Sequence, residues 1–90
     1  MDLFHVVVNI QQFSEHDTLY VERPWTLESE AQVLNIKGHA TPTIHIENKV
    51  YAYFLNIDLV DELWTQFESQ NLCLRTICQR IVEFALDQHS

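Results

Sequence analysis

The feature that most constrains the fold is an amphipathic stretch in the last third of the chain. Val60, Leu63, Trp64 and Phe67 follow the i, i+3, i+4, i+7 spacing that places side chains on one buried face of a helix. This spacing predicts a helix over residues 59–68, with Asp58 as its N-cap.

A second helix is predicted from after Asn71 to about Asp87. Its apolar side consists of Leu74, Ile77, Cys78, Ile81, Phe84 and Ala85. Because only Ser69-Gln70-Asn71 separates the two helical patterns, we expect them to pack as an antiparallel hairpin.

Four stretches in the middle of the chain have the alternating or continuous apolar pattern of strands: residues 18–22, 31–36, 43–47 and 50–57. The last is apolar on both faces, which is typical of a central strand covered on both sides. Asn48-Lys49 is predicted to be the hairpin turn between the last two strands. Further turns are predicted at Arg23-Pro24 and at residues 38–42.

The N-terminal segment fits two structures. Leu3, Val6, Val7 and Ile10 fit a helix behind an Asp2 cap, whereas an alternating strand through the same residues suits the β-branched valines. We favour the helix, because the polar residues that follow extend its polar face. The prediction is one α+β domain spanning residues 1–90, in which a small antiparallel sheet packs with an N-terminal helix and a C-terminal helical hairpin.

The chain holds thirteen Asp and Glu against five Lys and Arg, which gives a formal net charge of −8 at pH 7. This balance argues against direct binding to the backbone of nucleic acids, because such binding requires clustered Lys and Arg. The one glycine, Gly38, excludes the Gly-rich phosphate-binding loops of P-loop and dinucleotide-binding proteins.

No pattern of histidine, cysteine or serine predicts a metal, cofactor or catalytic site. The five histidines lack the close His or Cys pairs that mark zinc sites. Ser14-Glu15-His16-Asp17 contains the residue types of a serine triad, but adjacent side chains cannot align a nucleophile, a base and an orienting group. We therefore expect a non-enzymatic protein without cofactor or metal.

The chain opens without the basic and apolar run of a secretory signal, and its apolar runs are far shorter than a membrane span. Cys73 and Cys78 are five residues apart, so on a helix they point in different directions and are poorly placed for a disulfide. We expect both to be small buried residues of a protein in the reducing cytoplasm, without contact with a membrane.

Acidic residues beside aromatic residues form the candidate partner-binding surface, although acids also serve simply to keep a small domain soluble. Opposite charges speed association and select partners, and Trp and Tyr are enriched as interface anchors. Trp25 lies between Glu22 and Glu28 and is the main anchor candidate, with a buried core position as its alternative. The predicted partner-binding residues are Glu15, Asp17, Glu22, Trp25, Glu28, Glu30, Asp58, Asp61 and Glu62. Nearby aromatic residues are Tyr20, Tyr51 and Tyr53.

Across most of residues 10–88 the chain resembles a family of short bacterial proteins, through Leu19-Tyr20, Pro24-Trp25-Thr26-Leu27 and residues 55–60 leading into a helix. That family belongs to the immunity proteins of contact-dependent inhibition and other polymorphic toxin systems. The resemblance implies a cytoplasmic protein that blocks a cognate toxin domain, often a nuclease, by covering its active site. It carries no catalytic signature and assigns no role to any single residue.

Charge and resemblance together predict an immunity protein that binds a basic toxin, a nuclease, and occludes its active site with an acidic surface. The alternative is a phage-encoded acidic DNA mimic such as an anti-CRISPR protein, which uses the same charge against a nucleic-acid-binding target. A third hypothesis, a small enzyme or ligand-binding domain, requires a deep pocket lined by His39, His45 and Tyr53.

Overall fold

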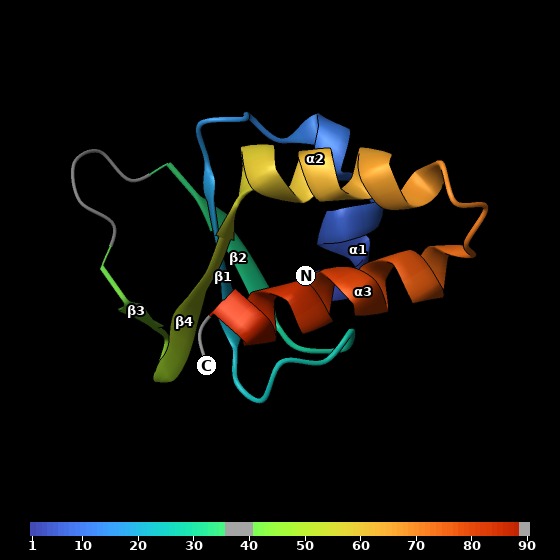
Figure 1. Ribbon diagram of the computed structural model, residues 1–90. Helices are drawn as coiled ribbons and strands as arrows, with labels where there is room; N and C mark the ends of the chain where they lie inside the picture. Colours follow the sequence, from blue (N-terminus) through green and yellow to red (C-terminus); the bar gives the residue numbers. More distant parts are fainter. Residues whose placement is uncertain (36–40, 89–90) are drawn as a thin grey trace.

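The computed structural model describes residues 1–35 and 41–88 and shows the predicted α+β architecture (Figure 1). Its elements, in chain order, are α1 (Leu3–Val8), the 3-10 helix η1 (Ile10–Gln12), β1 (Thr18–Glu22), β2 (Ala31–Leu34), β3 (Thr43–Ile46), β4 (Lys49–Asn56), α2 (Ile57–Glu68) and α3 (Leu74–Gln88). Among the described helices, none combines the length and the apolar character that crossing a bilayer requires.

The N-terminal segment is helical, as favoured. The Asp2 carboxylate caps α1 by accepting the His5 backbone N–H at 2.9 Å, and this hydrogen bond lowers the pKa of Asp2. Leu3, Val6 and Val7 are buried on one side of the helix. Packing of this apolar side outweighs the strand propensity of the valines, because burial contributes more than intrinsic preference.

The four strands form one antiparallel sheet in the order β2-β1-β4-β3, so β4 is a central strand as predicted. Ile46 pairs with Lys49, which makes Glu47-Asn48 the two-residue turn, one position earlier than predicted. Both turn residues have positive φ, 50° and 67°, as the turn of a tight hairpin requires. The predicted turn at residues 38–42 lies largely outside the described residues.

A β-bulge on β4 turns two consecutive side chains toward the core. Leu19 pairs with Leu55 while Tyr20 pairs with Tyr53, so Phe54 has no partner on β1. Phe54 and Leu55 are both buried in the core cluster. The bulge therefore explains why two consecutive residues of this strand, Phe54 and Leu55, are both apolar.

The helices pack together to one side of the sheet, and α2 and α3 run antiparallel as the predicted hairpin (Figure 1). Val60 and Leu63 are buried, while Trp64 and Phe67 are half-buried against the same core. In α3, the predicted core residue Leu74 is 48% exposed, because it begins the helix at the end away from the sheet, and Val82 is buried instead.

The predicted start of α2 is wrong by two residues. β4 continues into α2 without a loop, so Ile57 is the first helical residue and Asn56 is the N-cap. Asp58 lies in the first turn, where its Oδ1 accepts the Leu59 N–H at 2.8 Å and where the helix dipole favours a negative charge.

Candidate functional site

Acidic residues of α2 and of the segment before β1 come from two parts of the chain that lie side by side. The Ile57 N–H donates to the Asp17 carbonyl oxygen at 3.0 Å, so this segment runs beside the start of α2 (Figure 1). Asp58, Asp61 and Glu62 follow the i, i+3, i+4 spacing of one helix face, and all three are exposed. We define the α2 acidic group as Glu15, Asp17, Asp58, Asp61 and Glu62.

The charge of the α2 acidic group is hardly neutralised within the fold. Among the described residues, the only ion pair of this group joins Glu15 to His16, at 3.7 Å and in a fully exposed position. Like charges three and four residues apart on a helix are destabilising by a few tenths of a kcal/mol per pair. The fold thus concentrates negative charge here without an internal cation to compensate it.

The other predicted acids flank or belong to the connection between β1 and β2, and we call Glu22, Glu28 and Glu30 the β1–β2 acidic group. Glu28 Oε1 lies 3.3 Å from Arg75 Nη2 of α3. Glu30 Oε1 lies 2.7 Å from the N-terminal ammonium of Met1, and this hydrogen bond lowers the pKa of Glu30. Two of the three carboxylates therefore make contacts within the fold.

The nine predicted partner-binding residues do not gather at one place, because β1 separates the two acidic groups. Asp17 precedes the first residue of this strand, and Glu22 is its last residue. A five-residue strand spans about 13 Å at roughly 3.3 Å per residue. The structure thus offers the α2 acidic group as one candidate surface and sets the β1–β2 acidic group apart from it.

Trp25 lies in the core and not at the surface, so it does not supply the exposed anchor that we predicted. Its side chain is 6% exposed, its indole N–H donates to the Val21 carbonyl oxygen at 3.1 Å, and its ring meets Phe54 edge-on at 5.0 Å. Tyr20 and Tyr51 are also buried. The half-buried aromatic residue in these stretches is Tyr53.

The two cysteines have different environments, contrary to the expectation that both are buried. Burial raises the pKa of the Cys78 thiol to about 11. Cys73 is exposed because α3 begins only at the next residue, and a hydrogen bond with the Thr76 hydroxyl lowers the pKa of its thiol. Within the described residues, no three His, Cys, Asp or Glu side chains come together as metal ligands; His39 and His89 lie outside that set.

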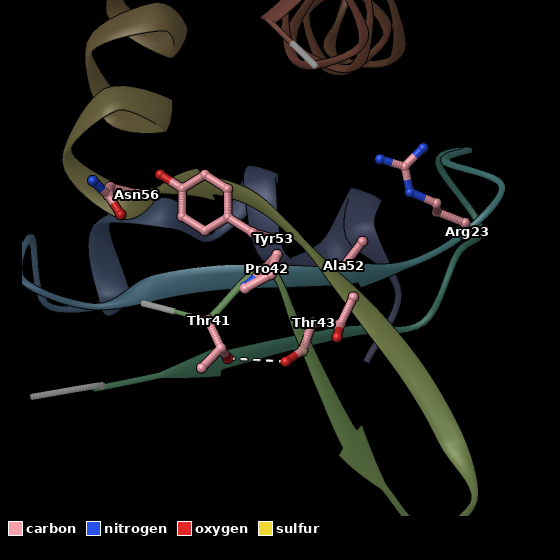
Figure 2. A pocket seen from close by; sticks show the side chains of 7 residues that line it. All are labelled: Arg23, Thr41, Pro42, Thr43, Ala52, Tyr53 and Asn56. Carbon is pink, nitrogen blue, oxygen red and sulfur yellow. Dashed lines mark hydrogen bonds between the residues drawn. The ribbon is translucent and has the colours of Figure 1, made fainter. Parts of the chain in front are cut away.

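A cavity of about 540 Å³ opens over β4, and we call it the Tyr53 cavity (Figure 2). It is lined by Arg23, Thr41, Pro42, Thr43, Ala52, Tyr53 and Asn56. Of the pocket residues in the third hypothesis, Tyr53 lines the cavity, His45 does not, and His39 lies outside the described residues. No sequence pattern marks Arg23 or Asn56 as cavity residues, because three separate segments meet here only through the register of the sheet.

Comparisons with protein-family models, with curated proteins and with solved structures found no match for this chain. The resemblance to immunity proteins therefore stays a prediction, and no relative assigns a role to any residue. The charge and geometry of the chain itself are what bear on its function.

Proposed function

We propose that this chain is a non-enzymatic immunity protein that binds a basic toxin domain, a nuclease, in the cytoplasm. The observation that carries the proposal is the α2 acidic group, in which four exposed acids and the half-buried Asp17 come from two neighbouring segments. Among the described residues, its one ion pair is the exposed contact between Glu15 and His16. Charges that make no contact within a fold remain available to a partner.

The proposed mechanism is occlusion by charge. A nuclease groove presents cations that hold polyphosphate, and a helix face carrying Asp58, Asp61 and Glu62 offers carboxylates to the same cations. Such complementarity accelerates association by about 10- to 1,000-fold at low ionic strength and selects against acidic proteins. Asp17, held beside the start of α2 by its backbone, widens this negative surface.

The experiment starts with a pull-down from the native host, followed by mass spectrometry, to identify the bound toxin. The association rate of the purified pair is then measured for the unchanged protein and for the triple variant D58K/D61K/E62K. We expect the triple variant to associate about 10- to 1,000-fold more slowly at low ionic strength. The difference should shrink as added salt screens the charges, since the Debye length is only about 10 Å at 0.1 M.

The matched control is E47K/E83K/D87K, which replaces three exposed acids that lie outside α2. Each triple variant changes the formal net charge from −8 to −2, because every replacement adds two units of charge. The proposal requires the control to associate much faster than D58K/D61K/E62K. Equal rates for the two variants would show that only net charge matters, and a bound protein without a basic surface would rule out the mechanism.

A further inference from the structure

Arg23 is a preorganised cation at one end of the Tyr53 cavity. Its guanidinium carbon lies 4.3 Å from the centroid of the Trp25 ring, a cation–π distance. Trp25 is itself fixed by its hydrogen bond to Val21 and its edge contact with Phe54. Among the described residues, no carboxylate forms an ion pair with Arg23, although the chain has thirteen acids.

The other described residues that line the cavity are neutral. Ala52 and Pro42 supply apolar surface between Arg23 and the opposite end, where Tyr53 and Asn56 lie (Figure 2). The rim includes Thr41 and Thr43, and none of the described lining residues is acidic. In a strongly acidic protein, Arg23 therefore makes its end of the cavity a locally positive site.

The Tyr53 hydroxyl can donate a hydrogen bond at neutral pH. Burial raises its pKa above the usual value of 10.0, and the nearby Tyr20 and Asp58 act in the same direction. The phenol therefore stays protonated. It places a polar group at the end of the cavity away from the guanidinium, close to the Asn56 amide (Figure 2).

We propose that the Tyr53 cavity binds a small organic anion, with its charged group on Arg23 and its apolar body on Ala52 and Pro42. Guanidinium groups bind carboxylate and phosphate oxygens through paired charge-assisted hydrogen bonds. A volume of about 540 Å³ lies within the usual range for ligand sites, roughly 300–1,000 Å³. This proposal is independent of the toxin proposal, because the two use different residues.

The test is a titration of the full chain in which two-dimensional amide NMR spectra are recorded at each ligand concentration. The probes are benzoate and phenyl phosphate, with benzamide as the neutral counterpart of benzoate. Each is added up to about 10 mM, a concentration at which a site with a Kd near 1 mM is mostly occupied. We expect both anions to shift the amide resonances of Thr43, Ala52 and Tyr53. The Kd for benzoate should be about tenfold lower than that for benzamide, the factor typical of one charge-assisted hydrogen bond.

Arg23→Gln should remove the preference for benzoate, while Arg80→Gln on α3 should leave it unchanged. The amide spectrum of each variant also reports whether it is folded. The proposal is overturned if neither anion shifts the cavity resonances or if benzamide binds as tightly as benzoate. Both of these results are measured on the wild-type protein, so they test the proposal even if R23Q fails to fold.

Discussion

In the β1–β2 acidic group, Glu28 and Glu30 each lie against a cation of the same chain. In the α2 acidic group, Asp58, Asp61 and Glu62 lie against none within the residues that the structure describes. The two groups carry similar side chains and both reach solvent. They differ in where the backbone puts the few basic groups, because Arg75 and the N-terminus both reach the β1–β2 connection.

The carboxylates Glu28 and Glu30 therefore hold elements of the fold together, whereas the carboxylates of the α2 acidic group can bind a partner. Glu28 links the β1–β2 connection to α3, and Glu30 links β2 to the start of the chain. Trp25, in the same connection, fills the core. Substitutions around the β1–β2 connection should therefore change stability, whereas substitutions in the α2 acidic group should change binding.

Trp25 should contribute most to stability among the residues of the β1–β2 connection. We expect Trp25→Ala to lower the free energy of unfolding by about 3–5 kcal/mol, because it leaves a cavity beside Phe54 and removes the indole hydrogen bond. Urea denaturation measures this change. Trp64→Ala is the control, and it should cost less because Trp64 is half-buried. Equal costs for the two variants would contradict the core role of Trp25.

A smaller effect on stability is expected in the α2 acidic group. The double variant D61N/E62Q should change the free energy of unfolding by no more than about 0.5 kcal/mol, because both side chains are exposed and make no ion pair among the described residues. The same variant should slow association with the basic partner. A loss above about 1 kcal/mol in urea denaturation would mean that these carboxylates are structural after all.

The ion pair between Glu30 and the N-terminus should make a small, pH-dependent contribution to stability. The pKa of Glu30 is lowered in the folded protein, so its pairing with the N-terminus stabilises the fold above the unfolded-state pKa, near 4.5. That contribution is lost as the pH falls through the lower folded-state pKa. We therefore expect Glu30→Gln to lower the urea midpoint slightly at pH 7, and the difference from the unchanged protein to close in acid.

Glu28→Gln is the control for this measurement. Its ion pair with Arg75 is longer, and both side chains are more than 60% exposed, so its effect at pH 7 should be smaller still. A midpoint difference for E30Q that stays constant down to the lowest pH at which the protein folds would exclude the pairing as its cause.

Several elements were predictable because their signal is local. The stripe of Val60, Leu63, Trp64 and Phe67 marks the inner face of α2, and the alternation at Leu19 and Val21 marks β1. Each pattern shows which face of one element is apolar. The bulge at Phe54 and the position of the hairpin turn depend on the register between two strands, which no single segment contains.

The α+β order of elements, the net charge and most of the apolar faces follow directly from the amino-acid sequence, because periodicity and composition are properties of short segments. The burial of Trp25, the division of the acids into two groups and the position of Arg23 at a cavity depend on how distant segments pack. Glu28 meets Arg75 across 47 residues of chain, so which charges are compensated depends on packing between distant segments. That packing fixes which carboxylates remain available to bind another molecule.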